Sequence, residues 1–132
     1  SELSDLSRIN LTDDKDQIIN KIKKAKTDTL PMPKDTKDLD GRLEAQNLLG
    51  IYTSLCNSTL ETSIKKFAGK NFSEFKEELS ELLVKKILPI SEEIKRLLKD
   101  QSYLDSILLN GVEKANKIAS KKILNIKELV GF

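Results

Sequence analysis

The amino-acid sequence predicts an all-α protein, an irregular bundle of five to six helices with a kinked long central helix. Apolar residues recur at intervals of three and four along most of the chain, as they do on one face of a helix. No segment alternates apolar and polar residues with the period of two that indicates a half-buried strand. Hydrophobic residues make up 38% of the 132 residues and aromatic residues only 5%, which suits one modest core.

The first helix is expected over residues 13–26. Acidic residues stand at its beginning and lysines at its end, an order that the helix dipole favours. The lysines of the stretch KIKKAK have two explanations. Lys24 and Lys26 in the last turn stabilise a helix C-terminus, whereas Lys21 and Lys23 extend the charge over a second turn and also suit an RNA contact. The residues alone leave both explanations open.

Residues 29–41 form a linker with two prolines at alternate positions, which predicts an exposed and partly extended course. A second helix is expected over residues 42–56. Gly50 inside it costs about 1 kcal/mol relative to alanine, so either another part of the chain approaches closely at this residue or the helix tolerates the cost. Cys56 lies next to the apolar stripe of this helix and is expected to be a small core residue. It is the only cysteine, so an internal disulfide is excluded, as suits a reducing compartment.

A short third helix is expected to begin with a capping box. In the stretch STLE, the Ser58 hydroxyl can accept from the backbone N–H of Glu61, and the Glu61 side chain can reach back. Gly69 is expected to end this helix, because glycine readily adopts the left-handed conformation found after helix C-termini.

The longest apolar stripe runs from Phe75 to Leu98 and predicts the long central helix. Pro89 lies in its middle and predicts a kink or a break near residues 85–89, because proline removes one backbone hydrogen bond and clashes with the preceding turn. The stripe could pair with a second chain as a coiled coil. The proline and the neighbouring amphipathic helices favour packing within one chain.

Two separate helices are expected in the last third of the chain, one from Ser102 to Gly111 and one from Val112 to about Val130. Lys114, Lys117 and Lys121 share one face of the last helix and form a possible track for RNA phosphates. A solvated outer helix face explains the same lysines. Aromatic residues are missing from this face, which argues against recognition of single-stranded bases by stacking.

Several classes of protein are excluded by composition. The chain has no histidine and one cysteine, which excludes the Ser-His-Asp triad, the Cys-His pair and the common zinc sites, so no metal site is expected. Its five scattered glycines form no phosphate-binding loop. Net charge is only +2, so any nucleic-acid surface must come from local clustering. No apolar run is long enough to span a membrane. The chain is a poor candidate for a self-contained enzyme.

Five segments of the chain, in order and at compatible spacing, resemble the C-terminal part of the bacterial-type tryptophanyl-tRNA synthetases, which are class I aminoacyl-tRNA synthetases. Together with the regions between them, these segments cover essentially the whole chain. They are INLTDDKDQIINKIKKAKTD at 9–28, EAQNLLGIYTSLCN at 44–57, FAGKNFSEFKEELSELLVKKILPI at 67–90, GVEKANKIASKKI at 111–123, and the closing LVGF.

The resemblance implies a division of the chain into four parts. Residues 1–11 follow the ATP-binding signature loop of a catalytic domain that is missing here, and Ser1 stands at or beside the last serine of that loop. Residues 12–28 form a connecting helix, residues 29–41 a linker, and residues 42–132 the helical domain that recognises the anticodon. On this resemblance, KIKKAK is mainly a helix C-terminus near the domain junction, and contact with the RNA backbone is the lesser possibility.

The resemblance also implies a parent enzyme that activates tryptophan with ATP and Mg²⁺ and charges tryptophan tRNA. The parent works in the cytoplasm as a homodimer through the missing domain, so this chain can be a monomer, and alone it is predicted to be inactive and to bind no cofactor. No catalytic residue carries over. The alternative is a free-standing helical module that binds another protein. The candidate tRNA-binding residues are cationic or amide groups near helix starts and on polar faces: Arg42, Asn47, Lys70, Lys114, Lys117 and Lys121.

Overall fold

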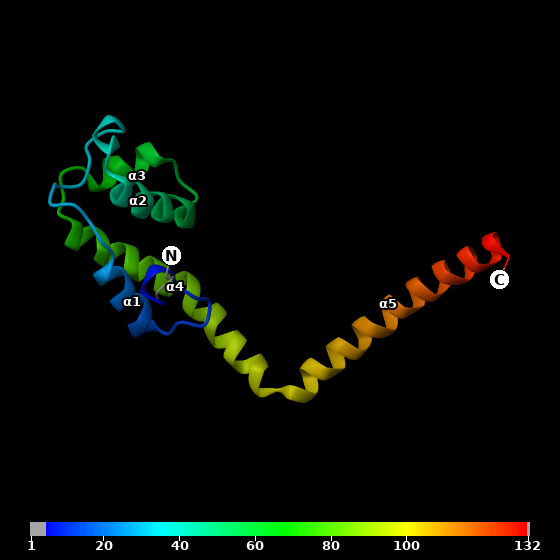
Figure 1. Cartoon of the computed structure of the whole chain (residues 1–132). Helices are drawn as coiled ribbons and strands as arrows, with labels where there is room; N and C mark the ends of the chain where they lie inside the picture. The colour runs from blue at the N-terminus through cyan, green and yellow to red at the C-terminus, as the bar shows by residue number, and fades with distance from the viewer. Residues whose placement is uncertain (1–4, 132) are drawn as a thin grey trace. The chain divides into compact units, whose positions relative to one another are not determined.

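The computed structural model describes residues 5–131, and these residues form α-helices and short 3₁₀-helices without any strand (Figure 1). The all-α prediction is confirmed. The chain divides into two compact units, residues 1–92 and 93–132, and the helix α4 crosses the boundary. The described helices are η1 (Asp5–Ser7), α1 (Lys15–Lys24), η2 (Lys37–Leu39), α2 (Leu43–Cys56), α3 (Leu60–Phe67), α4 (Phe72–Lys99) and α5 (Gln101–Val130).

A capping box begins α1. The Asp14 carboxylate accepts a hydrogen bond from the backbone N–H of Gln17 at 2.9 Å, and the Gln17 side chain accepts one from the backbone N–H of Asp14 at 2.8 Å. Two backbone donors of the first turn therefore have partners, and Asp14 is the residue that fixes where the helix begins.

The capping box predicted for α3 is wrong. Thr59 caps this helix instead, with its hydroxyl accepting from the backbone N–H of Thr62 at 3.2 Å. The Ser58 hydroxyl lies 3.1 Å from the hydroxyl of the buried Ser63, so it is occupied by a contact across the turn. Ser58 and Thr59 are adjacent hydroxyl residues and either type can cap a helix, so the sequence pattern predicted the wrong one.

An aromatic cluster forms the centre of the core in residues 5–92. The ring of Phe75 on α4 is fully buried and lies edge-to-face with Phe67 of α3, with the centroids 4.8 Å apart. Tyr52 of α2 contacts the same two rings at 4.9 and 6.0 Å. Edge-to-face contacts add to the free energy gained by burial. Three helices thus meet at one cluster, which α1 and the linker extend through Ile18, Ile22, Met32 and Leu39.

The linker over residues 29–41 is partly buried, which corrects the expectation of an exposed connector. Met32 is 1% exposed, and its backbone accepts from the N–H of Gly69 at 3.1 Å and donates to the carbonyl of Lys70 at 2.8 Å. Gly69 has a φ of +73°, a conformation that favours glycine, and this allows the turn between α3 and α4 to meet the linker. Leu39 anchors the far end of the linker in the core.

Pro89 does not break α4, which runs without interruption to Lys99. Of the kink or break predicted near residues 85–89, the break is therefore wrong, and the kink stays a prediction. Pro89 is exposed, as is Lys85, whose carbonyl loses its helical partner. Water can reach a carbonyl on this side of the helix, so the missing hydrogen bond is tolerated.

The last third of the chain is one helix, α5, and not the two that were predicted. Gly111 lies inside it, where a glycine costs only about 1 kcal/mol and does not end a helix that continues on both sides. The cap is Asp100, which accepts from the backbone N–H of Tyr103 at 3.1 Å, and not Ser102. Gly131, with a φ of +83°, ends the helix.

The end of α2 also differs from expectation. Cys56 is exposed and does not belong to the core. The helix ends at this residue because Asn57 adopts the left-handed conformation, with a φ of +50°. At Gly50 an added Cβ would meet nothing within 4 Å, so the glycine is tolerated and no neighbour requires it.

Candidate nucleic-acid interface

A row of three lysines on α5 is the most accessible basic surface among the predicted site residues. Lys114, Lys117 and Lys121 are all exposed, and none of them forms an ion pair within residues 5–131. Their spacing of three and four residues places them on one side of the helix, over roughly 10 Å of its length. Exposed, unpaired ammonium groups at this spacing can contact successive phosphates of one nucleic-acid strand.

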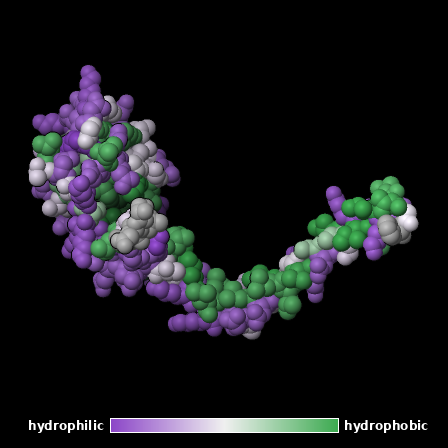
Figure 2. All heavy atoms as spheres, viewed as in Figure 1, coloured by the Kyte–Doolittle hydropathy of each residue, from purple (hydrophilic) through white to green (hydrophobic). Residues whose placement is uncertain are grey.

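An apolar stripe runs along another side of α5. Leu108, Val112 and Ile126 are each more than half exposed, and no element of residues 93–131 packs against them. Figure 2 shows hydrophobic side chains along α5. Because an amphipathic helix gains most of its stability from packing its apolar side, this stripe is suited to contact another surface.

Arg42 is held in place by contacts with the linker. Its guanidinium forms two hydrogen bonds with the Asp28 carboxylate, at 2.8 and 2.9 Å, and a third with the carbonyl of Pro31 at 2.9 Å. The side chain is 11% exposed and lies 5.8 Å above the ring of Phe72. These contacts join the two ends of the linker. They give the charge of Arg42 a structural role, which explains why a cationic residue stands at this position.

Replacing Arg42 with glutamine is expected to lower the free energy of unfolding by about 2 kcal/mol, because hydrogen bonds to charged groups are lost in a mostly buried place. Urea denaturation measures this. The matched control is Arg96→Gln, which removes an exposed bidentate pair with Glu93 and is expected to change stability little. Equal losses for both variants would contradict the structural role of Arg42.

The same contacts predict how stability depends on pH. Hydrogen bonds from Arg42 hold the pKa of Asp28 below its ordinary value of 3.8, more than its partial burial raises it. A carboxylate with a lowered pKa in the folded state stabilises the fold above 3.8, and that stabilisation is lost as the pH falls through the lowered pKa. The Arg42→Gln variant should therefore lose less stability than the unaltered chain over this acidic range.

The other predicted residues lie apart from one another. Asn47 is exposed on α2. Lys70 lies 3.4 Å from a carboxylate oxygen of Glu78 and 5.5 Å from the centre of the Phe67 ring, and its side chain is 39% exposed. Ser1 lies outside the described residues. The predicted tRNA-binding residues therefore lie on several surfaces, and among them only the three lysines of α5 form one continuous row.

Two buried or half-buried polar clusters were not predicted. In one, Lys66 donates a hydrogen bond to the Tyr52 hydroxyl at 2.7 Å and pairs with Glu78. The hydrogen bond to Glu78 and then that to Tyr52 raise the pKa of Lys66, and the contact with Lys66 lowers that of Glu78. The other cluster surrounds Lys21, which is 4% exposed. Lys21 shares the buried side of α1 with Ile18, so a lysine on an apolar stripe was the available signal.

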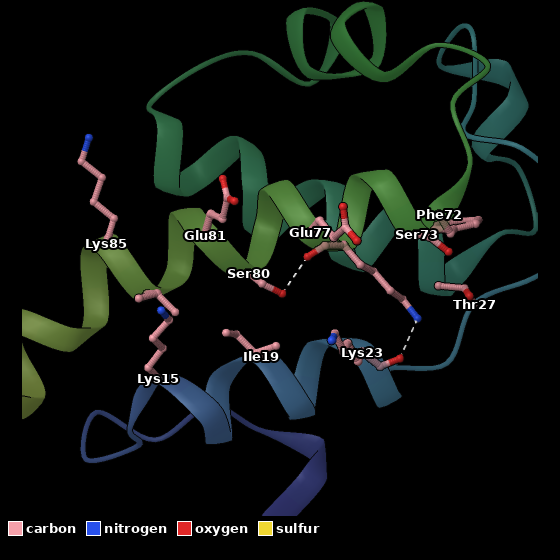
Figure 3. Close-up of a pocket in the computed structure, with 12 residues that line it drawn as sticks. Lys15, Ile19, Lys23, Thr27, Phe72, Ser73, Glu77, Ser80, Glu81 and Lys85 are labelled. Carbon is pink, nitrogen blue, oxygen red and sulfur yellow. Dashed lines mark hydrogen bonds between the residues drawn. The ribbon is translucent and has the colours of Figure 1, made fainter.

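A groove of about 730 Å³ lies between α1 and α4 (Figure 3). On the α4 side, Lys76 reaches the end of α1 and donates to the carbonyls of Lys23 at 3.2 Å and Ala25 at 2.6 Å. Burial lowers the pKa of Lys76. The rim carries both signs of charge, with lysines on α1 and the neighbouring carboxylates of Glu77 and Glu81 on α4, so it is not a uniform anion site.

Neither a metal site nor a membrane segment is found in the part of the chain that the structure describes. Residues 5–131 contain no group of three or more histidine, cysteine, aspartate or glutamate residues that could hold a metal ion. Within the same range, no helix is both long and apolar enough to cross a lipid bilayer.

Comparison with curated proteins finds relatives along the whole chain. Over all 132 residues, the chain is 45% identical to tryptophan–tRNA ligases of Brucella melitensis, Caulobacter vibrioides and Rickettsia felis. It spans 37%, 38% and 39% of their lengths, respectively, and corresponds to their C-terminal part. No protein-family model matches the chain. The resemblance predicted from the sequence is confirmed.

Proposed function

We propose that this chain, a relative along its whole length of the C-terminal part of the tryptophan–tRNA ligases, is the helical part with which such an enzyme recognises its tRNA. The observation that carries the proposal is the 45% identity over all 132 residues. The exposed lysine row on α5 supports it, because phosphate contacts supply much of the affinity for RNA.

The whole protein would activate tryptophan with ATP and Mg²⁺ and transfer it to tryptophan tRNA, in the cytoplasm and as a homodimer. The chain spans little more than a third of the length of its relatives. The nucleotide chemistry would belong to the remainder, because residues 5–131 form only helices and contain no histidine. The role left for this chain is to hold and identify the RNA.

The predicted site residues would divide this work. Lys114, Lys117 and Lys121 would contact phosphates and carry no sequence preference. Asn47 is the candidate for reading a base edge, since its amide is exposed and can both donate and accept hydrogen bonds. Arg42 would act indirectly by holding the linker, because its donors already bind Asp28 and Pro31.

The test is a titration of tryptophan tRNA with the chain at low salt, beside a measurement of tryptophan-dependent ATP–pyrophosphate exchange. We expect saturable binding whose affinity falls steeply as the salt concentration rises, and no exchange activity. Exchange turnover by the chain alone would contradict the assignment of the chemistry to the remainder. Absence of tRNA binding at low salt would contradict the RNA-binding role.

A second candidate function is a helical module that binds a protein, and the exposed apolar stripe of α5 favours it. The two functions differ in what disrupts them. A charged residue introduced by Ile126→Glu would abolish binding of a protein to the stripe, because a charge would be buried there. A stable complex with a protein that Ile126→Glu abolishes, together with no binding of tRNA, would favour this alternative.

A further inference from the structure

Lys21 of α1 is a buried cation that lies between two carboxylates of the preceding segment. Its ammonium nitrogen is 2.7 Å from Oδ2 of Asp13 and 3.1 Å from Oδ2 of Asp5. Lys21 and Asp13 are each 4% exposed, whereas the Asp5 side chain is 64% exposed. Lysine is rarely buried to this extent unless it is paired, so the two carboxylates explain its position.

Asn10 closes the cluster. Its backbone N–H donates to Oδ2 of Asp13 at 2.8 Å, and its side-chain amide donates to Oδ1 of Asp5 at 2.9 Å. The backbone N–H of Asp13 donates in turn to the carbonyl of Asn10 at 3.1 Å. Every connection of this cluster joins α1 to the segment over residues 5–13, or joins two points of that segment to each other.

Apolar contacts contribute little to holding residues 5–13 against the rest of the fold. Leu6 and Leu11 are about half exposed, and only Ile9 packs partly against the core. A buried ion pair is a directional contact, since its charges must stay within hydrogen-bond distance to offset the cost of their desolvation. The cluster is therefore able to fix one course of a segment that hydrophobic packing leaves free.

We propose that the cluster of Asp5, Asn10, Asp13 and Lys21 is a latch that holds residues 5–13 in one fixed course against α1. The latch makes the segment and α1 move as one rigid piece. Lys21 is then a positioning residue, and Asp13 is its fixed partner within the fold.

The use of this latch rests on the proposed function. The chain corresponds to the C-terminal part of its relatives, so the counterpart of residues 5–13 in them lies at the beginning of that part. A rigid segment there would transmit the orientation of the preceding part of the enzyme to the helices that hold the RNA. A flexible segment would separate the two.

Hydrogen exchange of single backbone amides tests the latch. The variant is Lys21→Met, which keeps an unbranched apolar side chain of similar length and removes the charge. We expect the amides of Asn10 and Asp13 to exchange at least about tenfold faster than in the unaltered chain, while amides in the middle of α2 keep their rates. Unchanged rates at Asn10 and Asp13 would overturn the proposal.

The matched control is Lys24→Met, which removes the same charge one turn later from an exposed position with no ion pair in the described residues. It should leave the amides of residues 5–13 unchanged. An equal acceleration in the control would also overturn the proposal, because net charge would then explain the effect.

A second variant decides the case if Lys21→Met unfolds the chain. Asp5→Asn removes only the exposed carboxylate and leaves the acceptors of the Asn10 and Asp13 amides in place. These amides should then exchange roughly threefold faster, and no change would refute the latch. A chain that shows these rates but binds no tRNA keeps the latch and loses the proposed function.

Discussion

Phe75→Ala is expected to lower the free energy of unfolding by about 3–5 kcal/mol, through the lost burial of the ring and the cavity that it leaves. Phe75 is fully buried and contacts rings from three elements, with Phe72 as the most distant at 6.5 Å between centroids. Because a domain of this size is stabilised by only about 5–15 kcal/mol in total, the variant should lose a large part of its stability. Urea denaturation followed by near-ultraviolet circular dichroism, which reports packed aromatic residues, measures the loss.

Leu43→Ala is the control for this prediction. Leu43 begins α2 and is 73% exposed, so truncation should change the free energy of unfolding by no more than about 0.5 kcal/mol. If Phe75→Ala were as mild as Leu43→Ala, the aromatic cluster would not be the centre of the core.

Replacing Lys114, Lys117 and Lys121 together with glutamine is expected to weaken tRNA binding roughly tenfold or more at low salt. Removal of each phosphate contact should also flatten the dependence of log affinity on log salt by about 0.7–0.9, so the slope should change by roughly 2–3. Glutamine and lysine have similar helix propensities, so α5 should stay helical, as far-ultraviolet circular dichroism can verify. The effect should be the same for every tRNA, because phosphates carry no sequence information.

The control for the lysine row is a second triple variant with the same change in net charge. Lys24, Lys37 and Lys65 are exposed and form no ion pair within the described residues. Their replacement by glutamine should leave the salt slope nearly unchanged. An equal loss of affinity in both triple variants would show that net charge, and not the row on α5, attracts the RNA.

The number and order of the α-helices up to α4 could be predicted because periodic apolar residues report burial directly, whereas the short 3₁₀-helices η1 and η2 were not predicted. The wrong predictions of where a helix is interrupted concern glycine and proline, each of which can either end a helix or lie inside it. Gly111 lies inside α5 and does not end it, and Pro89 is tolerated because it faces solvent. Whether a glycine or a proline interrupts a helix depends on its surroundings, which the local sequence does not contain.

The roles of the lysines in KIKKAK likewise depend on surroundings that the local sequence does not contain. The structure gives neighbours in this stretch different roles: Lys21 lies in a buried cluster, whereas Lys26 pairs with Glu44 at 3.1 Å. Only three-dimensional contacts separate them, since the carboxylates involved come from other segments. The buried side of α1 offered a partial signal, because Lys21 follows Ile18 by three residues.

Exchange of the anticodon distinguishes a chain that recognises its tRNA from one that attracts any RNA by charge. The affinity of the chain for tryptophan tRNA is compared with its affinity for the same tRNA carrying a different anticodon, at one salt concentration. The proposed function predicts that exchange of the anticodon weakens binding roughly tenfold or more, because each base that is no longer recognised costs about 1–3 kcal/mol. Equal affinity for the two RNAs would contradict it, and would leave the chain a basic helical surface without a role in recognition.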